Sequence, residues 1–256
     1  MSAARPTARG PFDGVLQIVR YNWSLYAAAV AGSALVVAVV ILIHPPVVLS
    51  WLLVIGAAAG TFWLLVSLAV SYYIYDRSDL YQWSWIRDQM GLQPNHLVNI
   101  TAGLDETSGA LRQLYPDSEL TILDIYDRKA MPEPSIARAR LEGHAQPGTT
   151  AADFRALPLK TGSVDAVIVI FTAHELRDGT AREAFFIEAR RVLIPGGSML
   201  LVEHLRDAWN LAAFGPGAFH FFPRSDWLRV ARSAGFELQR ELPRTPFVRA
   251  CLLRHS

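Results

Sequence analysis

Two long runs without a charged side chain constrain the fold of this chain more than any other feature. They cover residues 25–43 and 51–75, and the segment between them contains Pro45 and Pro46. Proline cannot continue a helix, and about 20 apolar residues are enough for a helix to cross a bilayer. The pattern predicts a transmembrane helical hairpin over residues 25–75, in preference to two buried core helices or a cleaved signal peptide.

Basic residues near both ends of the hairpin indicate its orientation. Arg5, Arg9 and Arg20 precede the first run, Arg77 and Arg87 follow the second, and the connecting loop has no arginine or lysine. Because segments rich in these residues stay on the cytoplasmic side, we expect both termini in the cytoplasm. The sequence thus predicts a multi-pass protein of the cytoplasmic (inner) membrane, in contact with membrane lipids.

The second run contains Gly56 and Gly60, one helical turn apart. Small residues at this spacing let membrane helices approach closely. We expect them to pack against the first run, where Ala28 and Gly32 have the same spacing. A homodimer formed through Gly56 and Gly60 is the alternative.

The overall composition excludes several classes of partner and site. A net charge of +1 argues against a nucleic-acid-binding protein. The only cysteine, Cys251, excludes an internal disulfide and a cysteine-rich metal site. The seven histidines show no ligand spacing such as HxxxH, so the sequence predicts no metal site.

Four parts are expected along the chain. They are a cytoplasmic N-terminal segment (1–24), the hairpin (25–75), a linker (76–95) and a domain with its own core (96–256). The linker carries Trp83, Trp85 and Ile86 among polar residues. This suits a short interfacial helix on the bilayer surface, and packing against the following domain is an equal alternative.

Residues 96–256 alternate short apolar runs with helical patterns. Strands are expected at 97–101, 120–124, 149–152, 166–171, 198–203, 236–242 and 247–253, and helices at 106–115, 135–142, 181–193 and 225–234. Alternation of strands and helices favours a parallel sheet, while the last two strands are close enough in sequence to form an antiparallel hairpin. The predicted fold class is α/β, with a seven-stranded, mostly parallel sheet.

Three motifs in this domain carry a family resemblance. Residues 157–171 read LPLKTGSVDAVIVIF, residues 189–197 read ARRVLIPGG, and Ala234-Gly235-Phe236 precedes the last hairpin. In this order they resemble the class I S-adenosylmethionine-dependent methyltransferases, and the similarity covers nearly all of residues 96–256. The resemblance implies a Rossmann-like methyltransferase fold, methyl transfer as the activity and S-adenosylmethionine as the cofactor.

Cofactor residues are expected where the strands end, because ligands of open α/β sheets bind at the carboxyl edge. The candidates are Thr101, Gly103, Asp105 and Glu106 after the first strand, Asp124 at the end of the second and Asp153 after the third. Asp124 suits the hydrogen-bonding of ribose hydroxyls, or is simply a turn-forming acid. The family resemblance assigns Asp153 to the adenine amino group.

The first loop departs from the family's acid and G-x-G-x-G pattern. Asn99 stands at the acid, Thr101 and Asp105 replace two glycines, and only Gly103 remains. Asp105 and Glu106 can pair with the cofactor's ammonium group in place of the missing acid, and Asp105 can also cap the next helix. A domain that has lost activity is the alternative explanation of this loop.

His174 and Glu175 follow the fourth strand, where a methyl acceptor would lie. A histidine near its unperturbed pKa can take a proton from a hydroxyl group, and Glu175 can orient it or bind an amine. The alternative is a structural role, in which His174 caps the segment that follows it. The apolar, aromatic segment 205–223 is expected to be a substrate lid, with insertion at the membrane interface or core packing as alternatives.

These expectations combine into two functional hypotheses. The leading one is a membrane-anchored methyltransferase that acts on an apolar or lipid-like small-molecule acceptor. The alternative is an inactive methyltransferase-like domain that serves as a membrane-tethered binding or assembly module, as the altered glycine loop would allow.

Overall fold

A seven-stranded sheet forms the centre of the molecule. The computed structural model describes residues 10–91, 93–143 and 146–255, so Arg5 and Arg9 lie outside the described residues. The strand order is β3-β2-β1-β4-β5-β7-β6. Neighbours from β3 to β5 are parallel, whereas β7 is antiparallel to both β5 and β6. The predicted fold class is therefore confirmed.

The strands lie close to their predicted positions. They are β1 (His96–Thr101), β2 (Glu119–Asp124), β3 (Thr149–Ala151), β4 (Val164–Ile170), β5 (Leu193–His204), β6 (Phe236–Thr245) and β7 (Val248–His255). The main difference is β5, which begins five residues earlier than expected because Leu193 already pairs with Val164. β4 is almost continuously apolar and buried, as a central parallel strand covered on both faces should be.

Helices cover both faces of the sheet and extend beyond it. They are α1 (Asp13–Tyr21), α2 (Trp23–Ile43), α3 (Val47–Tyr72), η1 (Tyr73–Arg77), η2 (Leu80–Gln82), α4 (Trp85–Met90), α5 (Ser108–Leu114), α6 (Pro134–Glu142), η3 (Ala173–Glu175), α7 (Gly179–Val192), α8 (Ala208–Phe214), η4 (Gly215–His220) and α9 (Arg224–Ser233). Residues from α6, α7 and α9 share a core on one face, and residues from α4 and α5 share a core on the other.

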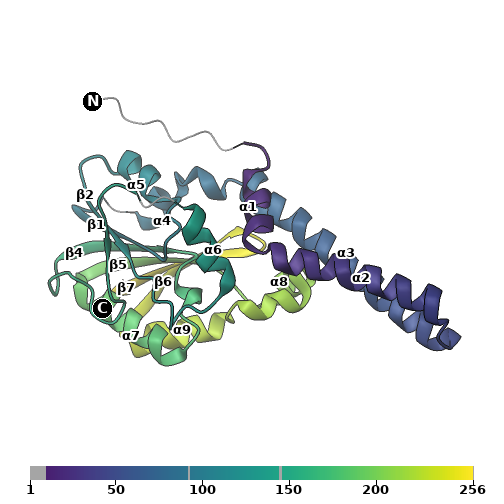
Figure 1. Cartoon of the computed structure of the whole chain (residues 1–256). Coiled ribbons are helices and arrows are strands. Elements are labelled where there is room, and N and C mark those ends of the chain that lie inside the picture. The colour runs from purple at the N-terminus through teal and green to yellow at the C-terminus, as the bar shows by residue number, and fades with distance from the viewer. Residues whose placement is uncertain (1–9, 92, 144–145, 256) are drawn as a thin grey trace.

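Helices α2 and α3 form a hairpin that projects away from the sheet domain (Figure 1). Both are long and apolar enough to cross a membrane, and the most apolar window of each is wholly unburied. The expected close packing of Gly56 and Gly60 on the first helix is wrong. Both glycines are exposed, and a Cβ added at either would meet no described atom within 4 Å.

The linker packs against the sheet domain. Trp83, Trp85 and Ile86 are 5%, 6% and 0% exposed and belong to the second core. The structure therefore corrects the expectation of an interfacial linker over residues 76–95 in favour of the alternative, since its apolar side chains are already covered by protein.

Helix α1 is an amphipathic helix inside the predicted cytoplasmic N-terminal segment 1–24, for which the sequence had suggested no helix. Two backbone N–H groups in its first turn, at Gly14 and Val15, donate to the two carboxylate oxygens of Asp76 at 2.7 and 2.8 Å. At its other end, Arg138 of α6 donates to the carbonyl oxygen of Tyr21 at 2.6 Å. A carboxylate at a helix N-terminus is favourable, so these contacts fix α1 between the hairpin and the sheet domain.

Candidate active site

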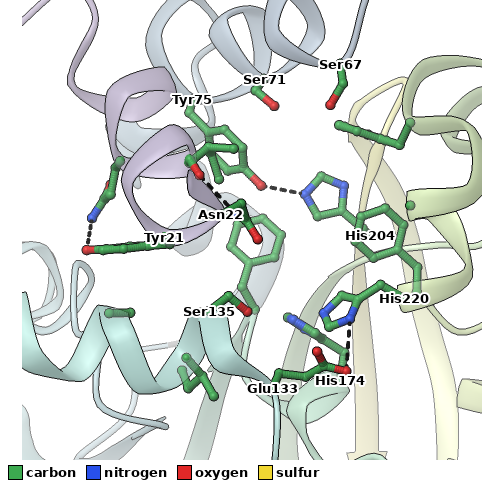
Figure 2. A pocket seen from close by; sticks show the side chains of 18 of the residues that line it. Tyr21, Asn22, Ser67, Ser71, Tyr75, Glu133, Ser135, His174, His204 and His220 are labelled. Atoms are coloured by element: carbon green, nitrogen blue, oxygen red, sulfur yellow. Dashed lines mark hydrogen bonds and ion pairs between the residues drawn. The ribbon is translucent and has the colours of Figure 1, made fainter. Parts of the chain in front are cut away.

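A cavity of about 610 Å³ lies between the hairpin and the carboxyl edge of the sheet. This size is typical of sites for small molecules. The helical side contributes Gln17, Ile18, Tyr21, Leu25, Ala29, Gly60, Trp63, Leu64, Ser67, Ser71 and Tyr75. The sheet edge contributes Ala102, Leu104, Glu106, Thr107, Phe171, Thr172, His174, Glu175 and His204. Figure 2 shows Ser67 and Ser71 opposite Glu133 and His174 across this space.

The loop after β1 holds Asp105 in a capping position. One carboxylate oxygen, Oδ1, accepts the backbone N–H groups of Thr107 and Ser108 at 3.0 and 2.9 Å, and the side-chain amide of Asn99 at 3.3 Å. The other oxygen, Oδ2, is buried and has no hydrogen-bond partner among the described residues. Buried acceptors are almost always paired, so Oδ2 retains an open acceptor position, although Asp105 is not among the residues that line the cavity.

Asp124 ends β2 as expected, but another protein side chain pairs with it. Its Oδ2 lies 2.6 Å from Nη1 of Arg140, and its Oδ1 accepts the backbone N–H of Tyr126 at 3.1 Å. The Arg140 guanidinium also lies over the Tyr126 ring, 4.2 Å from its centroid. Asp124 is thus absent from the lining of the cavity.

Gly103 explains how Arg140 reaches this position. Its φ of +103° is unfavourable for other residues, and a Cβ there would lie 2.1 Å from Nη1 of Arg140. We predicted that this glycine allows close approach of the cofactor. In the structure it allows close approach of Arg140, so a ribose can reach Asp124 only after Arg140 moves.

The remaining cofactor candidates divide between the cavity and the surface. Glu106 lines the cavity and accepts the hydroxyl of Tyr81 at 2.8 Å. Thr101 is buried and donates to the carbonyl of Leu123 at 3.5 Å. The side chain of Asp153 is 55% exposed and accepts the backbone N–H of Arg155. Among these candidates Glu106 is the one that lines the cavity, and access to Asp124 requires the displacement of Arg140.

His174 and Glu175 lie at the carboxyl end of β4, where they were predicted, and both line the cavity. Nδ1 of His174 lies 2.7 Å from a carboxylate oxygen of Glu203 at the end of β5, and its Nε2 lies 3.4 Å from Oε1 of Glu175. The backbone N–H of His174 also donates to Glu203 at 3.2 Å. Glu203 thus fixes both the ring and the backbone of His174.

These carboxylates correct the expected chemistry of His174. Burial lowers the pKa of His174, but Glu203 and Glu175 outweigh burial and raise that pKa to about 10. Burial tends to raise the pKa of Glu175, but its contact with His174 holds that pKa below its usual value. His174 is therefore protonated at neutral pH in this structure. A general base near its unperturbed pKa is the wrong description of it.

Two further histidines complete this side of the cavity. Burial and the nearby His174 lower the pKa of His204 to about 3 and that of His220 to about 4. His204 is held between the rings of Phe171 and Phe221, with centroid separations of 5.2 and 4.7 Å. Its Nδ1 donates to a backbone carbonyl at 3.0 Å, so its Nε2 accepts the hydroxyl of Tyr75 at 2.8 Å.

The predicted lid forms helix α8 and the turn η4, and it packs against the hairpin. The indole N–H of Trp63 in α3 donates to the carbonyl of Ala212 at 3.2 Å, and the Trp63 ring lies against Gly215. Phe214, His220 and Phe221 line the cavity. This segment is therefore one wall of the cavity.

Sequence reasoning missed Glu203, His220 and Arg140 as site residues. Glu203 was visible only as the acid that ends a predicted strand, and its pairing with His174 depends on β4 and β5 being neighbours. His220 comes from the aromatic segment and was not separated from its neighbours. Arg140 lies on the exposed-looking helix α6, and nothing in its local sequence pointed to Asp124.

Comparisons with known proteins agree with this fold. Residues 99–201 match a protein-family model described as a methyltransferase domain, and no curated protein sequence matches the chain. An S-adenosylmethionine-dependent methyltransferase from Aquifex aeolicus is similar in structure, with a TM-score of 0.51 and 14% identity over 67% of this chain and 88% of that chain. A Pyrococcus horikoshii protein gives a TM-score of 0.51 and 15% identity over 70% and 92%. Identities this low show the fold alone.

Proposed function

We propose that this chain is an S-adenosylmethionine-dependent methyltransferase that is anchored in a membrane and methylates an apolar or lipid-like small molecule, as its match to a methyltransferase domain supports. S-adenosylmethionine is its cofactor and supplies the methyl group. The finer assignments, which are the anchor, its orientation and the acceptor, rest on the geometry of the cavity.

One observation carries the proposal: a single cavity has walls from both the apolar hairpin and the carboxyl edge of the sheet. Leu25, Ala29 and Leu64 belong to helices that are long and apolar enough to cross a membrane. Phe171 and His174 belong to the edge where ligands of this fold class bind. A molecule dissolved in the bilayer could therefore reach this edge along the hairpin.

Exposed aromatic residues beside the hairpin support a membrane location. Trp209 and Phe219, on the segment that packs against α3, are 62% and 63% exposed. Aromatic side chains of this kind are favoured where protein meets the lipid headgroups. Together with Arg77 at the end of η1, which follows α3, and Arg87 in α4, they support an arrangement with the sheet domain on the cytoplasmic face.

Different residues would bind the cofactor and the acceptor. The loop carrying Asp105 and Glu106 would hold the methionine end of the cofactor, and Asp124 its ribose once Arg140 has moved. The cavity would hold the apolar part of the acceptor. Alignment of the acceptor and exclusion of water by the surrounding aromatic side chains can account for much of the rate.

Substitution of two glycines on one helix tests this route. Gly60 lines the cavity and Gly56, one turn away, does not, while neither has a described neighbour within 4 Å of an added Cβ. Gly60→Trp should place an indole in the acceptor path. Because the indole would occupy space that the acceptor needs, we expect transfer of a labelled methyl group to membrane-extracted lipid to fall by ~10-fold or more, a rise in the barrier of about 1.4 kcal/mol.

Gly56→Trp is the matched control, because it adds the same side chain to the same helix. It should leave methyl transfer unchanged, and both variants should bind S-adenosylmethionine as the unmodified protein does. Equal activity of the Gly60 and Gly56 variants would contradict entry along the hairpin. Transfer only to water-soluble acceptors would contradict the proposed acceptor class.

A further inference from the structure

Two segments that are far apart in the sequence bring three potential metal ligands together. His174 and Glu175 follow β4, and His220 ends η4. One ligand atom from each lies within 4.8 Å of the other two. Figure 2 places His174 and His220 side by side at one end of the cavity, and their ring centroids are 5.2 Å apart.

The orientation of His174 is the one that metal-binding histidines usually have. Its Nδ1 lies 2.7 Å from a carboxylate oxygen of Glu203, and its Nε2 faces Glu175, 3.4 Å from Oε1. Histidine ligands almost always have such a carboxylate or carbonyl on the second ring nitrogen, which fixes the ring. Glu203 is thus placed to act as a positioning residue.

A buried oxygen without a partner points into the same group. Oε2 of Glu175 has no hydrogen-bond partner among the described residues, although the side chain is only 8% exposed. Leaving a buried acceptor unpaired costs about 1–3 kcal/mol, and more if it is charged. A cation bound by this carboxylate would remove that cost.

Three carboxylates lie against the two imidazoles, and they outnumber the nearby cations in the described part of the chain. Glu175 and Glu203 contact the protonated His174, and the part-exposed Glu133 contacts His220 at 3.7 Å and Arg177 at 3.8 Å. Buried carboxylates need positive partners. Arg177 also donates to the carbonyl oxygens of His174 and His220 at 3.1 and 2.7 Å, so it ties the two ligand-bearing segments together.

We propose that Nε2 of His174, the carboxylate of Glu175 and the imidazole of His220 bind a divalent transition-metal ion, which displaces the Nε2 proton of His174 to solvent as it binds. Two imidazoles and one carboxylate suit zinc, cobalt, iron and manganese, whereas magnesium and calcium prefer oxygen ligands. Ligand atoms bound tetrahedrally at about 2.1 Å from one ion lie ~3.4 Å apart. The present spacing, within 4.8 Å, therefore needs to close by ~1.4 Å at most.

The site faces the cavity, because all three ligands line it. Three protein ligands leave at least one coordination position open, and an oxygen atom of a molecule in the cavity could occupy it. Metal binding stands on this geometry alone and does not depend on the proposed methyl acceptor.

Metal binding by the full-length protein in detergent tests the inference. After treatment with a chelator, the protein is titrated with Co²⁺, followed by its visible absorption, and the Zn²⁺ content is measured after dialysis. We expect one ion per chain. His220→Ala and Glu175→Gln should each weaken binding by ~100-fold or more, and Glu203→Gln by about 10–100-fold, the usual loss for a residue that positions a ligand.

His44→Asn is the control, because it removes an imidazole from the loop between α2 and α3, far from the cluster in sequence and on the hairpin. It should bind as the unmodified protein does. Absence of a bound ion in the unmodified protein, or unchanged affinity in Glu175→Gln, would overturn the site. If His220→Ala fails to fold, Glu175→Gln decides alone, because it keeps the side-chain volume. A protein that binds the ion but transfers no methyl group would contradict only the proposed function.

Discussion

Removal of Arg140 should strengthen cofactor binding, which is the opposite of the usual effect of deleting a side chain from a site. In the structure, Arg140 pairs with Asp124 at 2.6 Å and covers the ring of Tyr126 at 4.2 Å. A ribose that binds Asp124 must first displace this guanidinium. Binding therefore includes the cost of breaking both contacts, and Arg140→Ala removes that cost.

The size of the effect follows from the exposure of the pair. The side chains of Arg140 and Asp124 are 31% and 14% exposed, so screening by solvent limits their attraction to the upper part of the range for surface pairs, about 1 kcal/mol. The stacking on Tyr126 adds about 0.5–1 kcal/mol. Together these contributions, about 1.5–2 kcal/mol, predict S-adenosylmethionine binding that is ~10–30-fold tighter.

Calorimetry with the full-length protein in detergent measures this directly. Arg128→Ala is the control, because it removes the same charge from an exposed position four residues beyond Asp124. Asp124→Ala loses hydrogen bonds to a charged group worth roughly 1.5–3 kcal/mol but also frees the pair with Arg140, about 1 kcal/mol, so binding should weaken by about 0.5–2 kcal/mol. Weaker binding in Arg140→Ala would refute the competition, and would mean that Arg140 assists the cofactor. Unchanged affinity in Asp124→Ala would remove Asp124 from the site.

Three further outcomes test the arrangement of the chain. Cys251 is buried, and burial together with Glu241 raises its pKa to about 12; it should therefore resist thiol reagents at pH 8 and react only after denaturation, as measured by mass spectrometry. Because Cys251 should not react, Val47→Cys should be the sole position labelled by an impermeant thiol reagent in intact cells. Gln239→Cys should be labelled only in permeabilised cells. The reverse labelling pattern would mean that the topology is inverted. The exposed face at Gly56 should support a homodimer, so Gly56→Leu should shift sedimentation in detergent towards the monomer, and a protein that is monomeric without the change contradicts this.

The sequence predicted those parts of the fold that depend on local pattern. β4 was recognised because its apolar run is nearly continuous, and the last hairpin because only a short turn separates β6 from β7. Helix α1 was missed because its stability comes from distant partners, Asp76 and Arg138. The side on which Trp85 is buried could not be read from sequence, since a bilayer surface and a protein core select the same residue types.

The site shows the same division between local and distant information. His174 was placed correctly, because the carboxyl end of a central strand is fixed by topology. Its protonation was predicted wrongly, because that depends on Glu203, which is 29 residues away and reaches His174 only through the pairing of β4 with β5. The pairing of Asp124 with Arg140 was missed for the same reason.

The position of the cavity has a consequence for how the enzyme would meet an acceptor that is dissolved in the bilayer. Moving such a molecule into water costs about 0.8 kcal/mol for each methylene group, so a chain of ten carbons would cost ~8 kcal/mol. A wall built from Leu25, Ala29 and Leu64 would let the acceptor's carbon chain pass from lipid to protein without entering water. Turnover would then follow the mole fraction of acceptor within the membrane, and adding more lipid at a fixed amount of acceptor would slow the reaction.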